Sequence, residues 1–316
     1  MIATMSELGP WRRTDRSNAV ILGLLGVLVL TNLWQNSTRF EPSNLPSTIG
    51  LAAPTVLVAM ASVPAILGGG GGLDISLGPM VGLLNVVIVK EFIVEGHSNP
   101  ALIIGAALVG GAALGAINGA VVVGLRLQPI VATLATYLIF AGLSPWVMRS
   151  PEGFVPDWLA RFSDELSFVP FLIAVVMWLL FRLAPAHGML LAVGGSDRAA
   201  YASAVPVGSI RFLSYVLGGA LAGTAALALT ALIGSGDPSI GPTFTLKALA
   251  AVALGGVSLA GGRGGLLNAA IGATVLFQLE LLLTGAGVSS FVLRIVYGSV
   301  LLSAVVVNSL LRPRAA

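Results

Sequence analysis

The stretch GGGGGLDISLG, Gly68–Gly78, separates two long apolar segments and carries the acid Asp74. A carboxylate that faced lipid at this point would be costly, so Asp74 is expected to face protein or water. A glycine-rich break between apolar segments is typical of membrane helices that are interrupted or that re-enter the membrane. The stretch therefore predicts a polytopic membrane protein with an internal polar path.

The composition supports lipid as the solvent of this chain. Of its 316 residues, 56% are hydrophobic and 9% are charged, whereas soluble domains carry about 25% charged residues. The 40 glycines suit close helix packing and broken helices. The chain has no cysteine, which excludes disulfides, thiolate metal sites and cysteine nucleophiles. Its net charge of +3 does not indicate nucleic-acid binding, because the basic residues lie at the ends of the apolar segments.

The predicted fold is all-α, a membrane protein of about ten transmembrane helices with glycine-broken or re-entrant segments. A spanning helix needs about 20 apolar residues, and the long apolar runs do not show the alternating polarity of barrel strands. The predicted spans are Ala19–Trp34, Ile49–Leu67, Leu77–Val94, Ala101–Val123, Ile130–Met148, Phe168–Leu183, Phe212–Ile233, Ala248–Ala260, Leu266–Leu283 and Val288–Leu310.

The distribution of Lys and Arg predicts that both termini are cytoplasmic. With the N-terminus inside, basic residues dominate the inside loops and acids dominate the outside loops, as the positive-inside rule requires. Residues 1–18 are then a cytoplasmic N-terminal segment, and residues 19–311 form a single transmembrane domain. The longest outside loop is 149–167 and the longest inside loop is 184–210. The first apolar segment is expected to be a retained helix, because no small-residue cleavage site follows it.

The inside loop 184–210 is predicted to contain a short helix from Ser196 to Ala204. Serine or aspartate at its start suits a helix cap, and the alanines that follow are good helix formers. Val205-Pro206 would end the helix. A short exposed helix with small apolar residues at the cytoplasmic face needs a partner to cover that face.

Two intramembrane acids have alternative interpretations. Three roles are open for Asp74: it lines a transport path, contacts a partner, or caps a half-helix, where its charge meets the positive helix end. Capping and a direct part in transport are compatible in a broken helix. Glu280 either forms a structural pair with Arg294 between the last two spans or stays unpaired, which would suggest function. The candidates for residues that line a translocation pathway are Asp74, Ser76, Asn118 and Glu280.

Glycines at every fourth position, Gly111, Gly115 and Gly119, and again Gly219 and Gly223, predict flat helix faces. Packing within one subunit is favoured over a subunit interface as their role. The stretch GGVSLAGGRGG, Gly255–Gly265, is interpreted as a second break between membrane segments, because it lacks the Lys-Ser/Thr end of a phosphate-binding loop.

No pattern indicates catalysis or a metal site. The chain contains neither GxxxxGK[ST] nor a GxSxG elbow, and nothing assembles a nucleophile with a base and an orienting group. His97 and His187 fall in loops on opposite sides of the predicted membrane, so they cannot form a metal site together. A membrane enzyme is therefore disfavoured.

Four ordered stretches resemble the permease subunits of bacterial ABC importers of the ribose/xylose/arabinose type, the simple-sugar branch that includes autoinducer-2 permeases. GGLDISLG (Gly71–Gly78) is similar to the family's GGIDLSVG, and LQPIVATLATYLIFAGL (Leu127–Leu143) is similar to PPFIATLG…GL. AVGGSDRAAYASAVPVGSIRF (Ala192–Phe212) is similar to AIGGNxxAAxxSGI, and ALAAVALGGVSLAGGRGG (Ala248–Gly265) is similar to AIAAVVLGGTSLSGGRG. Together they cover most of the chain from Gly71 to Gly265.

The resemblance implies a subunit of an importer in the bacterial inner membrane that forms the path for a monosaccharide or related small polar solute. Its partners would be a second permease, identical or paralogous, two ATP-binding subunits and a periplasmic substrate-binding protein. ATP and Mg²⁺ would bind to the partner subunit, and this chain would hold no cofactor. The segment that matches the family's ATPase-coupling loop comprises Gly194, Gly195, Ser196, Asp197, Arg198, Ala199 and Ala200.

Two other functions remain open at this point. One is a permease for branched-chain amino acids, a branch that shares distant features with the sugar permeases. The other is a stand-alone secondary transporter or channel, with Asp74 and Glu280 as its ion or proton sites. The second predicts transport by the purified single chain under an ion gradient without ATP.

Overall fold

The computed structural model describes residues 10–310. This part of the chain is helical throughout, apart from loops and one isolated β-bridge between Glu152 and Gly236. The first half of the predicted N-terminal cytoplasmic segment, residues 1–9, and the C-terminal residues 311–316 lie outside the described residues. Residues 10–18 already belong to the first helix.

The elements follow one another along the chain in the following order: α1 (Pro10–Gln35), the short 3₁₀ helix η1 (Ser37–Phe40), α2 (Leu45–Leu67), α3 (Leu77–Val87), the π-helical segment η2 (Ile88–Ile93), α4 (Pro100–Gly124), α5 (Pro129–Val147), α6 (Asp157–Ala160), the 3₁₀ helix η3 (Arg161–Ser163), α7 (Phe168–Leu183), α8 (Pro185–Gly195), α9 (Asp197–Ala202), α10 (Val207–Ile233), α11 (Thr243–Leu254), α12 (Leu266–Gly285) and α13 (Ser290–Leu310).

Each of the ten predicted apolar stretches corresponds to one of these α-helices. The prediction for Ala248–Ala260 is wrong at its end, because α11 stops at Leu254. Gly255 follows α11, and Gly256 adopts a positive φ of 76°, which favours glycine and turns the chain away from the helix. The third stretch, Leu77–Val94, is α-helical only to Val87 and continues as a π-helix.

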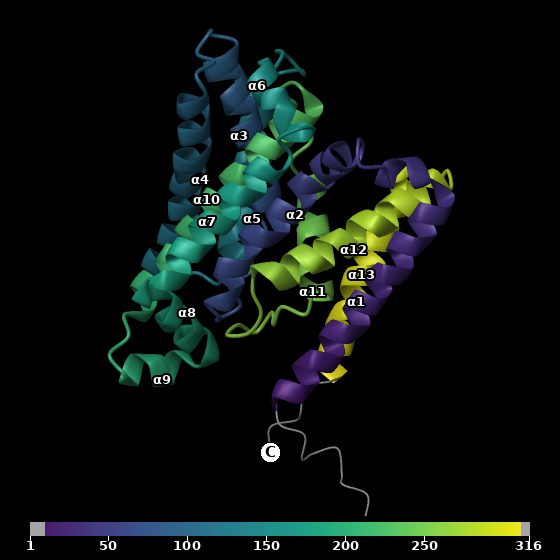
Figure 1. The fold of residues 1–316 in the computed structure, drawn as a ribbon. Helices are drawn as coiled ribbons and strands as arrows, with labels where there is room; N and C mark the ends of the chain where they lie inside the picture. The colour runs from purple at the N-terminus through teal and green to yellow at the C-terminus, as the bar shows by residue number, and fades with distance from the viewer. Residues whose placement is uncertain (1–9, 311–316) are drawn as a thin grey trace, which may run out of the picture.

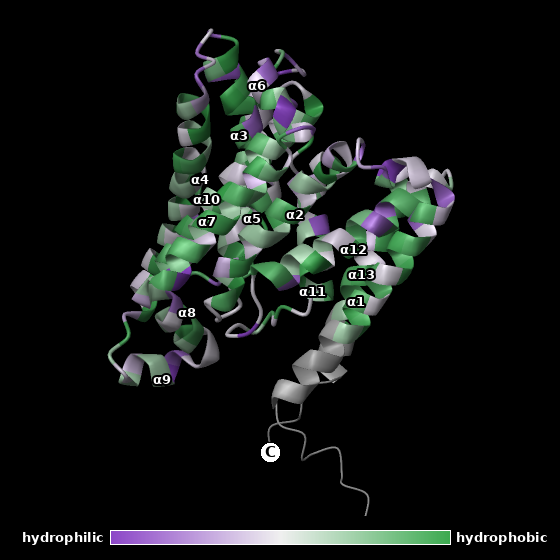
Figure 2. Ribbon diagram, in the orientation of Figure 1, coloured by the Kyte–Doolittle hydropathy of each residue, from purple (hydrophilic) through white to green (hydrophobic). Residues whose placement is uncertain are grey.

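Five helices of the described region are long and apolar enough to cross a membrane: α2, α4, α5, α10 and α12. The pair α7 and α8, which is bent by 83°, makes a sixth if the two are counted as one broken span. The apolar parts of α1, α11 and α13 are shorter. Figure 2 shows hydrophobic residues along the helices, while hydrophilic residues gather mainly at their two ends and in the loops.

Helices α2 and α10 form the centre of the molecule. Over an apolar stretch of 18 residues in each helix, 89% of the stretch is buried in α2 and 78% in α10, against 22% in α4 and 28% in α5. The exposed faces of α4, α5 and α7 carry large apolar side chains such as Val109, Leu138 and Leu180. A helix that is buried on one side and apolar on the other suits lipid as its outer neighbour. Helices α1, α12 and α13 lie together beside this centre, and α11 connects the two groups (Figure 1).

The glycine stripes join α4 to α10 within the subunit. A methyl group on Gly115 would collide with the carbonyl of Tyr215 and lie 3.1 Å from Gly219 Cα. One on Gly219 would lie 2.9 Å from Gly115 Cα. The interpretation of the stripes as packing inside one subunit is therefore confirmed for these two helices.

Different helices lie at the two ends of the helix bundle. Helices α8 and α9 lie at one end, where α1 begins and α13 ends, and α6 lies at the opposite end (Figure 1). The inside loop predicted at 184–210 and the outside loop predicted at 149–167 are thus at opposite ends of the molecule.

Candidate functional site

The segment α8–α9 forms a compact helical corner at its end of the molecule. Helix α9 begins at Asp197, and its N-cap is Ser196, whose hydroxyl accepts a hydrogen bond from Ala199 N (3.3 Å). The cap fits the preference of serine for this position. The predicted short helix is confirmed, although it ends at Ala202, two residues earlier than expected. Of the residues proposed for coupling, Arg198 and Ala199 are exposed and Ala200 is buried.

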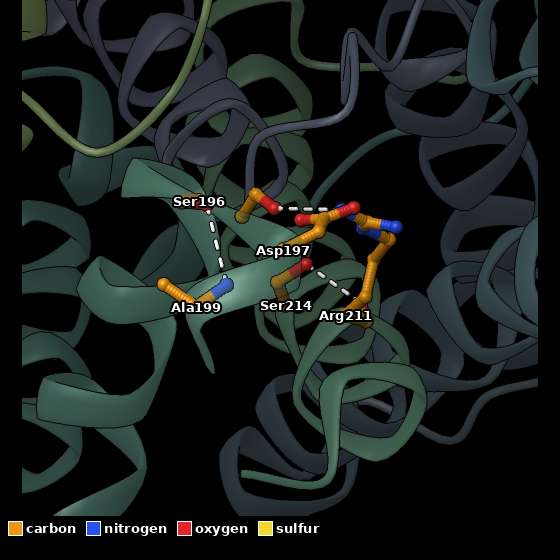
Figure 3. Close-up of polar contacts among 6 residues, drawn as sticks. Ser196, Asp197, Ala199, Arg211 and Ser214 are labelled. Carbon is orange, nitrogen blue, oxygen red and sulfur yellow. Dashed lines mark hydrogen bonds and ion pairs between the residues drawn. The ribbon is translucent and has the colours of Figure 1, made fainter. Parts of the chain in front are cut away.

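One arginine connects α9 to the helix core. Arg211, in the first turns of α10, places Nη2 2.8 and 2.9 Å from the two carboxylate oxygens of Asp197 (Figure 3). The same nitrogen donates to the carbonyl oxygen of Gly68 at 3.3 Å. Gly68 is the C-cap of α2. A single guanidinium group therefore contacts both the predicted coupling helix and the end of the most buried helix.

Backbone atoms from three glycine-rich segments meet beside this arginine. A methyl group on Gly194 would collide with the carbonyl of Leu67 and lie 2.9 Å from Gly262 Cα, and one on Gly261 would lie 2.9 Å from Gly194 O. Gly262 N donates a hydrogen bond to Leu67 O (3.1 Å). We call Leu67, Gly69, Gly194, Gly261 and Gly262 the glycine junction. It connects the end of α2, the end of α8 and the loop between α11 and α12 without any intervening side chain.

The structure brings together three of the four candidate pathway residues. Asp74 Oδ1 accepts hydrogen bonds from the backbone N–H (2.9 Å) and the hydroxyl (2.7 Å) of Ser76. Asn118 Nδ2 donates to Asp74 Oδ2 (3.0 Å) and to Ser76 Oγ (2.7 Å). All three side chains are buried. Because Ser76 is the N-cap of α3, this network fixes the start of α3 against α4.

Two threonines hold the same segment from other helices. Thr133 of α5 accepts a hydrogen bond from Ile75 N (3.2 Å) and donates to Leu73 O (3.2 Å). Thr245 of α11 donates to Ile75 O (3.2 Å). A chain that leaves a helix inside a membrane must satisfy its backbone groups by such partners. The sequence did not identify these threonines, because hydroxyls in apolar helices have no distinctive spacing.

Glu280, the fourth candidate, belongs to a different contact. Lys247 Nζ lies 2.7 and 2.8 Å from its two carboxylate oxygens. Lys247 also lies 5.3 Å from the ring centre of Tyr297. The interpretation in which Glu280 pairs with Arg294 is therefore wrong, because α11 supplies the nearer cation. Lys247 is the fifth residue of α11.

A cavity between α2, α7 and α12 is apolar and lies apart from these residues. It measures about 800 Å³ and is lined mainly by apolar side chains, among them Met60, Trp178 and Phe277. Such walls offer few hydrogen-bond partners for a polar solute, so this cavity does not suit a sugar. Among the described residues no group of His, Cys, Asp or Glu is arranged to hold a metal ion.

Comparison with known proteins matches the chain to permease components of transport systems. A family model described as "Branched-chain amino acid transport system / permease component" matches residues 16–310. The ribose import permease RbsC of Bacillus subtilis is 32% identical over 314 residues, which cover 96% of this chain and 93% of that protein. The D-allose transport system permease AlsC of Escherichia coli is 29% identical over 277 residues, which cover 85% of this chain and 84% of that protein.

The autoinducer 2 import system permease LsrC of an Enterobacter strain is 32% identical over 309 residues. The matched residues cover 92% of this chain and 85% of that protein. No solved structure matches the chain.

Proposed function

The chain belongs to the family of transport-system permease components that this model describes, and on this premise we propose that it is the membrane subunit of an ATP-driven importer for a simple sugar. The relatives named for ribose, D-allose and autoinducer 2 match it over most of their length. This full-length similarity is the observation that carries the proposal. The chain acts as a transport component in the bacterial inner membrane, not as an enzyme.

The proposed assembly contains a second permease, two ATP-binding subunits that hold ATP and Mg²⁺, and a periplasmic binding protein that delivers the sugar. In this arrangement α9 faces the ATP-binding subunit, with Gly194 to Ala200 as the coupling segment. The exposed Arg198 and the half-exposed side chain of Asp197 support this assignment. The apolar character of the cavity between α2, α7 and α12 supports a translocation path that lies between two permeases.

For the membrane arrangement we propose about ten spans, with both termini in the cytoplasm. The spans are α1, α2, α3 with η2, α4, α5, α7 and α10 to α13, within a single permease domain of residues 19–311. The position of α8–α9 at the end where α1 begins and α13 ends supports this topology (Figure 1). The basic residues of the inside loops support the same orientation.

In the proposed mechanism ATP binding closes the ATP-binding subunits and moves α9. Such a movement changes transport only if the partner stabilises the inward-open and outward-open states differently. The glycine junction joins α8 to the end of α2, so it offers a direct route to the break at Gly68–Gly78. Asp74, Ser76 and Asn118 position this break; Glu280 holds α12 to α11.

Reconstitution tests the proposed function. The chain is inserted in liposomes with the ATP-binding subunit and the binding protein of its own operon, and ATP hydrolysis and uptake are measured for a panel of monosaccharides and for leucine. We expect one sugar to stimulate hydrolysis and to accumulate only with ATP. Uptake of leucine but of no sugar would assign the chain to the amino-acid branch. Accumulation by the permease alone, under an ion gradient without ATP, would refute the proposal.

A variant connects this test to the coupling segment. Replacing Asp197 and Arg198 with alanine is expected to lower sugar-dependent ATP turnover without loss of membrane insertion. Unchanged turnover in that variant would refute the coupling role of these residues.

A further inference from the structure

We infer that Arg211 is the positioning residue that transmits movement of α9 to the glycine break after α2. This inference rests on the proposed function and adds a residue that neither the motif nor the composition singles out. Arg211 is the fifth residue of α10, in the loop-facing end of an otherwise apolar helix. Its role follows from the groups that its guanidinium contacts, which lie on two elements far apart in the chain.

The first contact is with α9. Asp197 is the first residue of that helix, and Arg211 Nη2 lies within 2.9 Å of both carboxylate oxygens. The exposed fraction of the Arg211 side chain is 18%, against 47% for Asp197. An ion pair shielded on one side keeps more of its strength than an exposed one. A shift of α9 therefore pulls on Arg211.

The second contact is with the end of α2. The last carbonyl groups of a helix have no partner inside the helix and carry a partial negative charge. Arg211 Nη2 donates to one of them, Gly68 O, at 3.3 Å. A methyl group on Gly70 would lie only 2.7 Å from the same nitrogen, so the guanidinium lies directly against the glycine break. The break cannot shift here without moving the arginine.

The guanidinium also has unused donors and free space. Nε of Arg211 is buried and has no hydrogen-bond partner among the described residues, although an arginine offers five N–H donors. A cavity of about 310 Å³ lies beside it, lined by Arg126, Gly70 and Gly208 among others. Arg211 thus has room for a second arrangement in which Nε takes part in binding. A side chain that couples the movement of two segments must be able to adopt two arrangements.

The inference predicts that loss of Arg211 abolishes the coupling of ATP hydrolysis to sugar but leaves the complex assembled. If Arg211 acts only as a transmitter, its loss leaves the permease folded and bound to the ATP-binding subunit. ATP hydrolysis then continues at its basal rate but no longer responds to sugar. A residue that merely stabilises the fold would instead lower the amount of assembled complex.

The experiment uses the reconstituted complex and two changes of Arg211. Arg211→Met keeps the aliphatic volume and removes every donor. Arg211→Gln keeps two N–H donors but removes the charge and shortens the side chain, so it cannot bind Asp197 and Gly68 O as the guanidinium does. Arg182→Met is the matched control, since Arg182 lies in the last turn of α7 and forms no ion pair among the described residues. Co-purification of the ATP-binding subunit, basal hydrolysis and sugar-stimulated hydrolysis are measured for each.

We expect both variants to assemble and to lose sugar stimulation, with the ratio of stimulated to basal hydrolysis falling to about one, and the control to match the wild type. Wild-type stimulation in either variant would overturn the inference, because the contacts of Arg211 with Asp197 and Gly68 would then be dispensable. If Arg211→Met does not fold, Arg211→Gln decides alone. A wild-type complex that shows no sugar-stimulated hydrolysis would instead count against the proposed function.

Discussion

Two adjacent glycines at the end of α8 have very different surroundings, and this difference gives a sharp test of the glycine junction. A methyl group on Gly194 would collide with Leu67 O and lie 2.9 Å from Gly262 Cα, whereas one on Gly195 would meet nothing within 4 Å. Because the atoms that Gly194 faces belong to the backbone, they cannot rotate away. Gly194→Ala must therefore separate segments that are in contact, and Gly195→Ala must not.

The magnitude follows from three contributions. Overpacking of this kind costs about 1–3 kcal/mol. Separation also weakens the 3.1 Å hydrogen bond from Gly262 N to Leu67 O, which is worth about 0.5–1.5 kcal/mol. Alanine regains up to about 1 kcal/mol through its helix propensity. We expect Gly194→Ala to lower the free energy of unfolding by about 0.5–4.5 kcal/mol, and Gly195→Ala to leave it unchanged or raise it by up to about 1 kcal/mol.

The assay is equilibrium unfolding of the purified permease in mixed detergent micelles, with thermal inactivation as a second measure. Both variants keep the same charge and nearly the same volume, so Gly195→Ala controls for helix propensity alone. Equal stability of the two variants would show that the three segments do not meet as described. Sugar-stimulated ATP hydrolysis of Gly194→Ala would also be expected to fall, because the junction lies between α8 and α2.

Three further changes test other contacts. Gly115→Ala is expected to destabilise the protein by about 1–3 kcal/mol because its methyl group would enter the backbone of α10, whereas Gly105→Ala in the same helix has open space and should be neutral in the same unfolding assay. Glu280→Leu should cost about 1.5–3 kcal/mol by leaving the ammonium of Lys247 unpaired, and adding Lys247→Met should recover part of that loss; equal stability of the single and double variants would contradict the pair. Ser196→Ala removes the cap of α9 and should destabilise that helix by about 0.5–2 kcal/mol. We expect less ATP-binding subunit to co-purify with this variant, whereas Ser196→Asp should keep the cap and bind the subunit normally.

The sequence predicted the helices well because apolar length is a local property. All ten apolar stretches contain helices, and the cap at Ser196 was visible from residue type alone. The end of the eighth stretch was missed because Val257 and Leu259 are apolar but follow two glycines that stop α11. Hydrophobicity alone does not distinguish an apolar loop from the last turn of a helix.

The contacts that connect the site were harder to predict because they join distant parts of the chain. Gly69, Gly194 and Gly261 lie in three separate motifs, and nothing in their spacing shows that they meet. Arg211 did not stand out, because it directly precedes the predicted span that begins at Phe212, where basic residues are common. Glu280 could have had Arg294 or Lys247 as its partner, and only the packing of α11 against α12 decides between them.

The glycine junction has a mechanical consequence. At most helix contacts, side chains change rotamer when one helix shifts slightly, so the neighbouring helix shifts less. Between Gly69, Gly194 and Gly261 the main chains touch directly, and no side chain lies between them. A displacement at the end of α8 therefore moves the backbone after α2 directly, and the same holds between α4 and α10, whose backbones meet at Gly115 and Gly219.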